Sequence, residues 1–192
     1  AEEVPWPTAR LMWRARLERA APAFLAREAD EAGTPVILEE KGAVTLAPSG
    51  FTLTAKPDRI DALPDGRVHI LDYKTGAPPT AKQQAAFDKQ LLLEAAMAER
   101  GGFAPLGPRE VARITYVGLG ADMKVLTTEM TPEITAGVWE GLERLIARYL
   151  SPAQGYVARR AVFEARFPGD YDHLARFGEW DMTDAPHPED VG

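Results

Sequence analysis

One turn and its two flanks constrain the fold of this chain more than any other segment. The turn is Leu63-Pro64-Asp65-Gly66-Arg67. Proline presets φ, aspartate binds the nearby backbone through its side chain, and glycine adopts positive φ. The flanking residues alternate, with Ile60, Ala62, Val68 and Ile70 on one face and Arg59, Asp61, Arg67 and His69 on the other. This period of two predicts a β-hairpin, because successive side chains of a strand point to opposite faces.

The same turn predicts which residues of the two strands face each other. If Leu63 pairs with Arg67, counting back along both strands pairs Asp58 with Asp72. Directly opposed residues have Cβ atoms roughly 5 Å apart. Lys74 lies two residues beyond Asp72 and therefore shares its face. A slip of one residue would place the two aspartates on opposite faces. We expect two carboxylates and an amine to converge at one end of an apolar face.

This convergence suits a particular chemistry. Two carboxylates on an apolar face are unfavourable unless a positive charge joins them. Carboxylates, a backbone carbonyl and waters are hard oxygen ligands that suit Mg²⁺ or Mn²⁺. Phosphodiester hydrolysis uses such an ion to activate water, and a nearby lysine offsets developing charge. Asp58, Asp72 and Lys74 are thus candidate nuclease residues. The alternative is a surface hairpin with a simple Asp72–Lys74 salt bridge, which the placement of Asp58 disfavours.

The residues of the hairpin also resemble a known signature. Pro57-Asp58 followed by Asp72-Tyr73-Lys74 resembles the PD-(D/E)XK nuclease motif. The fuller pattern is similar to the RecB-like branch of that superfamily, and it comprises Asp58-Arg59-Ile60-Asp61, Leu71-Asp72-Tyr73-Lys74-Thr75-Gly76 and Gln90-Leu91. The resemblance implies a restriction-endonuclease-like α/β fold. We expect a central mixed sheet built from two strand pairs, with helices on both sides.

The resemblance further implies a role for each matching residue. Asp58 and Asp72 are expected to bind the metal, with the backbone carbonyl of Tyr73 assisting. Lys74 is expected to be catalytic. Gln90 is expected to lie in a helix against the site and to orient the lysine or the substrate; without the motif, a buried glutamine that caps a loop carbonyl would be the simpler interpretation.

Two further metal ligands are considered. Glu40 matches a glutamate that such nucleases often have on the strand before the hairpin. The branch also has a histidine on a preceding helix, and residues 8–31 contain none. That histidine lies before Ala1, or an acid such as Glu18 replaces it, or the activity is reduced.

The rest of the chain is expected to form three helices and further strands. The helices are predicted over residues 8–31, kinked or divided at Pro22, over Thr80 to about Arg100, and over 131 to about 150. The strands are predicted over 35–40 and 43–46, with a turn between them, and over 111–118 and 124–129 as a second pair. His69 is expected to be solvated or to face DNA, since it lies on the polar face of the hairpin.

Residues 155–180 mix arginine with aromatic side chains. Such a segment can grip single-stranded DNA by stacking and charge, and it can equally be a tail packed on the core. Arg59, Thr75, Arg159 and Arg160 are the candidate DNA contacts.

The C-terminal run Tyr171-Asp172-His173-Leu174-Ala175-Arg176 and Gly178-Glu179-Trp180 resembles the end of AddB subunits. That resemblance implies that residues 1–180 are the C-terminal nuclease domain of a longer AddB-like chain. It also implies an AddA-like helicase–nuclease partner and a role as an exonuclease in double-strand break repair. Residues 181–192 are acidic and are expected to be disordered.

Composition sets limits on these expectations. The chain has no cysteine, so it can hold neither a disulfide nor a cysteine-ligated iron–sulfur cluster, and a cytoplasmic location is expected. No apolar run reaches membrane-spanning length. The net charge of −7 disfavours a stand-alone nucleic-acid binder, which fits a domain working inside a larger assembly. The rival functions are a nuclease-fold module that binds DNA or scaffolds the complex with weak or no catalysis, and a nuclease acting on RNA or CRISPR-type precursors.

Overall fold

The computed structural model describes residues 6–30, 33–47, 49–120, 123–155, 173–174, 176, 178–181 and 183–185. Contacts divide the chain into two compact units, Ala1–Arg144 and Leu145–Gly192. The first unit holds the sheet and all the predicted nuclease residues of the hairpin. None of the helices in the described ranges is long and apolar enough to cross a membrane.

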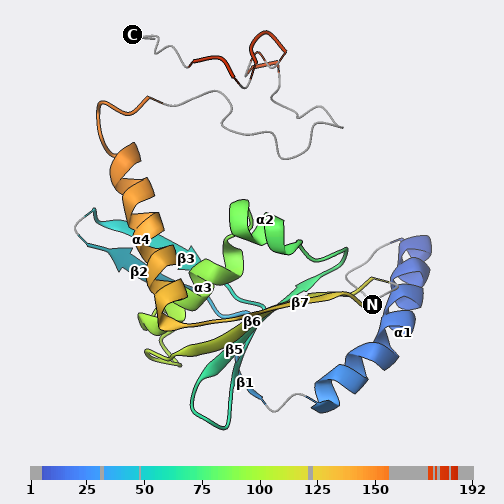
Figure 1. Ribbon diagram of the computed structural model, residues 1–192. Coiled ribbons are helices and arrows are strands. Elements are labelled where there is room, and N and C mark those ends of the chain that lie inside the picture. Colours follow the sequence, from blue (N-terminus) through green and yellow to red (C-terminus); the bar gives the residue numbers. More distant parts are fainter. Residues whose placement is uncertain are drawn as a thin grey trace. The chain divides into compact units, whose positions relative to one another are not determined.

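A five-stranded mixed sheet forms the centre of the first unit, in the order β1-β4-β5-β6-β7 (Figure 1). Its strands are β1 (Thr34–Leu38), β4 (Arg59–Ala62), β5 (Val68–Lys74), β6 (Val111–Gly118) and β7 (Val125–Glu129). Only the β5–β6 pair is parallel, and the other three pairs are antiparallel. The predicted α/β class with a central mixed sheet is therefore confirmed.

The hairpin register is as predicted. Leu63 N donates a hydrogen bond of 2.9 Å to Arg67 O, and Gly66 has a φ of 87°. Ile60 pairs with Ile70 and Arg59 with Leu71. Extending this register by one residue sets Asp58, which directly precedes β4, opposite Asp72.

The strands before the hairpin are arranged differently from the expectation. β1 joins the central sheet beside β4, whereas β2 (Gly42–Leu46) pairs with β3 (Phe51–Ala55) in a separate two-stranded sheet. The chain turns sharply after β1, where Glu39 has a φ of 51° and its N–H donates to Asp58 O at 3.2 Å. The central sheet was predicted to consist of two strand pairs only. It also contains β1, which lies at its edge.

The helices lie close to their predicted ranges, with one division. α1 (Pro7–Asp30) runs through Pro22 as a single helix, so it is not divided there. Thr80 caps α2 (Ala81–Ala86) in a capping box with Gln83. The single helix predicted from Thr80 to Arg100 was wrong, because the chain breaks before α3 (Gln90–Glu99), where Asp88 accepts a hydrogen bond of 2.6 Å from Tyr116 OH. α4 spans Pro132–Tyr149 and buries Thr135 and Trp139.

Helices cover both faces of β5. α3 contacts β5, β6 and β2, and its Gln90 reaches Asp72. On the alternate face, Phe24 of α1 packs edge-on against Tyr73, with ring centroids 5.9 Å apart. Because neighbouring residues of a strand point to opposite faces, α1 and α3 cover different sides of the sheet.

This double coverage overturns the expectation for His69. The side chain is fully buried, and Nε2 lies 2.8 Å from Thr115 Oγ1, so it is neither solvated nor facing DNA. A polar face in a two-stranded hairpin becomes interior when a parallel neighbour and helices cover both sides.

Gly42, the first residue of β2, provides a test of the packing of β2 against the loop that follows α3. A Cβ there would lie 2.3 Å from Phe103 Cδ1 and 2.5 Å from Gly102 O. Gly102 O also accepts a hydrogen bond of 2.9 Å from Ala43 N, so it cannot retreat freely. We expect Gly42→Ala to lower the free energy of unfolding by about 2–3 kcal/mol, measured by urea denaturation. Gly137→Ala in α4, where a Cβ would meet nothing within 4 Å, should not destabilise the protein.

Candidate functional site

The candidate site lies at the carboxyl ends of the parallel strands β5 and β6. In open α/β sheets, ligands bind at this edge because the strand ends and following loops surround it. Leu119 N donates a hydrogen bond of 2.8 Å to Lys74 O, which fixes the last residue of β5. A Cβ on Gly118 would lie 2.7 Å from Pro78 Cδ, so the loop after β5 returns tightly over the end of β6.

Asp58 is held beside Asp72 by the backbone of β5. Its Oδ2 accepts a hydrogen bond of 2.8 Å from Tyr73 N. The side chain of Tyr73 turns to the other face of the sheet, where it meets Phe24. The backbone of Tyr73 thus contacts Asp58 through its N–H, and its side chain lies on the other face.

Asp72, Lys74 and Gln90 form one hydrogen-bonded network. Lys74 Nζ lies 3.0 Å from Asp72 Oδ1 and 2.8 Å from Oδ2, and it donates to Gln90 Oε1 at 3.1 Å. Gln90 Nε2 donates to Asp72 Oδ1 at 2.9 Å. The amide of Gln90 therefore accepts from the lysine and donates to the aspartate, which fixes both side chains. Asp72 is 3% exposed, whereas the Lys74 side chain is 34% exposed and Gln90 is exposed. The network therefore joins a buried carboxylate to two side chains at the surface, and it includes Gln90 in addition to the simple Asp72–Lys74 salt bridge considered as the alternative.

Tyr116 of β6 supports the lysine. Lys74 Nζ lies 5.6 Å from the centroid of the Tyr116 ring, within the range of a cation–π interaction. The Tyr116 hydroxyl is fixed by its bond to Asp88, and burial raises the pKa of this phenol well above its usual range. Tyr116 was not singled out from the sequence, since a tyrosine in a buried strand carries no signal of its own.

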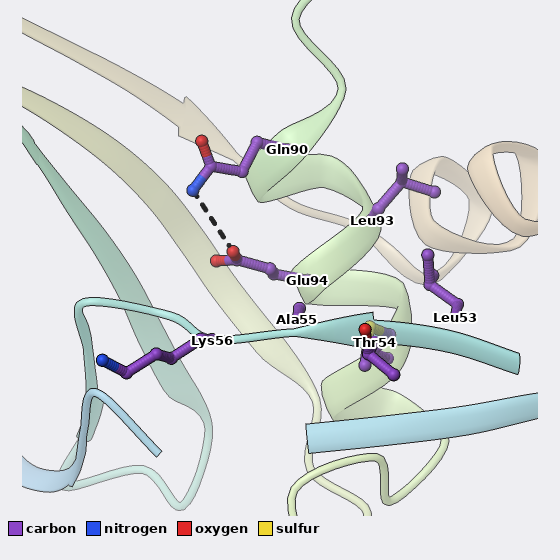
Figure 2. Close-up of a pocket in the computed structure, with 8 residues that line it drawn as sticks. Leu53, Thr54, Ala55, Lys56, Gln90, Leu93 and Glu94 are labelled. Carbon is purple, nitrogen blue, oxygen red and sulfur yellow. Dashed lines mark hydrogen bonds between the residues drawn. The ribbon is translucent and has the colours of Figure 1, made fainter. Parts of the chain in front are cut away.

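Glu94 lies at the site together with Asp58, Asp72 and Gln90. No role was predicted for it from the sequence. It is 3% exposed, and its Oε1 accepts a hydrogen bond of 3.3 Å from Gln90 Nε2 (Figure 2). Oε2 is buried without a hydrogen-bond partner. The pKa of Glu94 is raised to about 7, chiefly by burial and also by the charges of Asp72 and Asp58, against the hydrogen bond from Gln90, which lowers it. The available signal was its spacing of four residues from Gln90, which puts both on one helix face.

The acidic side chains fit a divalent cation by charge. Asp58, Asp72 and Glu94 would carry three negative charges when ionised, against one positive charge on Lys74, which leaves two in excess. Among the described residues, no three acidic or histidine side chains already form a metal-binding cluster. Mg²⁺ usually keeps several waters and uses one or two carboxylates directly, so this donor set suits an ion that is bound partly through its waters.

Arg59, a predicted DNA contact, is paired with two carboxylates. Its side chain is 12% exposed and forms ion pairs with Asp61 at 2.6 Å and with Glu28 at 2.5 Å. Asp61 is fully buried. Through these two ion pairs the guanidinium of Arg59 links Glu28 of α1 to Asp61 of β4.

The remaining predicted residues are placed apart from the network. Glu40 is exposed and follows the end of β1. Glu18, the acid considered in place of the histidine, is 62% exposed and pairs with Arg14 at 2.7 Å. Thr75 is exposed directly after Lys74. Arg159 and Arg160 lie outside the described residues.

A cavity of about 220 Å³ adjoins the site between β3 and α3 (Figure 2). Its lining consists of Leu53, Thr54, Ala55, Lys56, Gln90, Leu93, Glu94 and Met97. Gln90 and Glu94 thus belong both to the network around Asp72 and to the wall of this cavity.

Comparison with known proteins identifies the family. No curated protein matches the sequence. A solved structure titled "Crystal structure of SSO0001" is 12% identical, with a TM-score of 0.35, and the match covers 81% of this chain and 75% of that one. The family model of the PD-(D/E)XK nuclease superfamily matches residues 1–176. The chain therefore belongs to the PD-(D/E)XK nuclease superfamily.

Proposed function

We propose that this chain is a deoxyribonuclease domain that hydrolyses DNA phosphodiesters with Mg²⁺ or Mn²⁺. The observation that carries the proposal is the network in which Lys74 Nζ is within hydrogen-bonding distance of both the buried Asp72 and Gln90. Superfamily membership supports it, because PD-(D/E)XK proteins are usually nucleases.

Each residue of the network has a role in this proposal. Asp58 and Asp72, with the Tyr73 carbonyl, hold the ion. When bound, the ion supplies activation of water and neutralises charge on the phosphate. Lys74 positions or deprotonates the attacking water and offsets developing charge. Gln90 keeps the lysine amine directed at the site, since its Oε1 accepts from Nζ.

We also propose that the domain belongs to the RecB-like branch and is part of an AddB-like subunit that acts in the cytoplasm. The support is the sequence resemblance of residues 58–61, 71–76 and 90–91 and of the run from Tyr171 to Trp180. In this proposal an AddA-like helicase–nuclease is the partner, and the pair processes DNA ends in double-strand break repair as an exonuclease. The net charge of −7 supports a domain that relies on its partner to hold DNA.

The experiment uses the full-length subunit with its helicase partner, because the partner is part of the proposal. Linear duplex DNA labelled at either end, covalently closed circular DNA and RNA of matching sequence are incubated with Mg²⁺, Mn²⁺ or EDTA. We expect cleavage of linear DNA only with metal, and survival of the circle and the RNA. Cleavage that persists in EDTA, or no cleavage under any condition, would contradict the proposal.

One observation favours a second function, a nuclease-fold module that binds DNA without cutting it. α1 contains no histidine, whereas the RecB-like branch has a histidine ligand on a helix before the strands. Titration of Mn²⁺ into the protein separates the two functions, because a scaffold module has no need to bind the ion. Binding of DNA without any binding of Mn²⁺ would favour the module.

A further inference from the structure

Glu94 is the buried acidic side chain at the site that no predicted role uses. It belongs to α3, one turn after Gln90, and Figure 2 shows its carboxylate directed toward the end of Gln90 that faces the strands. One oxygen is engaged at 3.3 Å by Gln90. The other oxygen is buried and has no hydrogen-bond partner. A buried carboxylate oxygen left in this state is unfavourable unless a cation or a donor meets it.

We propose that Glu94 is a third carboxylate of the metal site, which holds a water molecule of the ion bound by Asp58 and Asp72. The inference rests on the proposed function and adds a residue to it. Gln90 Nε2 donates to both Asp72 Oδ1 and Glu94 Oε1, so a single amide nitrogen joins the two carboxylates. Glu94 therefore lies one side chain away from Asp72.

The bond through water follows from the geometry and from the chemistry of the ion. No three acidic side chains of the described residues are placed to ligate one ion directly. Mg²⁺ retains several of its waters in proteins, and these waters donate hydrogen bonds to nearby carboxylates. A side chain that acts on a metal through such a bond typically changes metal affinity by about 10–100-fold when it is replaced.

The alternative role for Glu94 is structural, in which it only orients the amide of Gln90. Glu94→Gln separates the two roles. Glutamine keeps an oxygen that accepts the hydrogen bond from Gln90, but it removes the negative charge that the metal waters require. Glu94→Asp keeps the charge on a shorter side chain and serves as the conservative variant.

Binding of Mn²⁺ to the full-length subunit is measured by the loss of the free-ion signal in electron paramagnetic resonance, without DNA. Glu110→Gln is the matched control, because it removes the same charge from an exposed residue that precedes β6 at the opposite end of the β5–β6 pair. We expect Glu94→Gln to weaken Mn²⁺ binding by about 10–100-fold. Glu94→Asp should recover part of this loss, and Glu110→Gln should bind like the unaltered protein.

The outcomes separate this inference from the proposed function. If the unaltered protein binds Mn²⁺ and Glu94→Gln binds it equally well, Glu94 is not part of the metal site, while the nuclease proposal stands. If the unaltered protein binds no Mn²⁺, the nuclease proposal itself fails. Thermal unfolding in EDTA shows whether the variants are folded. A loss of binding that Glu94→Asp does not restore at all, in a folded protein, would favour the structural role and overturn the inference.

Discussion

Replacement of Asp72 by asparagine or of Lys74 by methionine is expected to lower the rate of DNA cleavage by about 10²–10³-fold or more, because each removes a charge from the reacting centre. Asparagine keeps an oxygen that accepts from Gln90, which donates to Asp72 Oδ1 at 2.9 Å. Methionine keeps an unbranched side chain beside the Tyr116 ring. The rates are measured on end-labelled duplex DNA at saturating Mg²⁺.

The control for this prediction is Lys82→Met, since Lys82 is exposed on α2 and takes no part in the network. Its rate should equal that of the unaltered protein. Circular dichroism should show the same helix content in all three variants. Metal-dependent cleavage at full rate in both Asp72→Asn and Lys74→Met would show that the cutting site lies elsewhere in the protein.

Stability should fall as the pH rises from 5 to 8 when metal is chelated, and Glu94 is the cause. The pKa of Glu94 is raised from 4.5 to about 7 by burial, then by Asp72 and Asp58. Between these values the folded protein binds more protons than the unfolded chain, so the free energy of unfolding decreases with pH. The shift corresponds to up to about 3 kcal/mol, lost as pH passes through the folded-state pKa.

Glu94→Gln isolates this contribution. Glutamine resembles the protonated carboxyl, so the variant and the unaltered protein should have similar stability at pH 5. At pH 8 the variant should be more stable, by up to about 3 kcal/mol. Urea unfolding in EDTA at several pH values provides the measurement. Parallel stability curves for the two proteins would show that the Glu94 carboxyl ionises normally in the folded state.

The hairpin was predictable in detail because its information is local. The turn at residues 63–67 sets the register, and the register sets Asp58 opposite Asp72, as the pairing of Ile60 with Ile70 bears out. The ranges of α1, β6 and α4 followed from periodicity and capping residues. The bond between Lys74 and Gln90 joins the hairpin to a helix that a sequence motif placed against it.

The features that the sequence did not predict are those that depend on which distant residues pack against a side chain. His69 was expected at the surface, but the covering of both sheet faces buries it. The ion pair of Arg59 with Glu28 of α1 was not foreseen either. Residues 87–89 end α2 because Tyr116 of a later strand binds Asp88. Alternation within one hairpin contains no information about any of these partners.

Short-range spacing in the sequence was enough to predict the hairpin register and the convergence of Asp58, Asp72 and Lys74, because it places these side chains on a common face. The α/β class and Gln90 were predicted from the resemblance to the nuclease signature and not from spacing. Only the tertiary structure decided that Tyr116 lies beside the lysine and that Glu94 is buried near Asp72 with one oxygen unpaired. Burial and electrostatic repulsion depend on segments that meet only when the sheet closes against α3. Those long-range contacts give Glu94 its raised pKa, which its position in the sequence does not reveal.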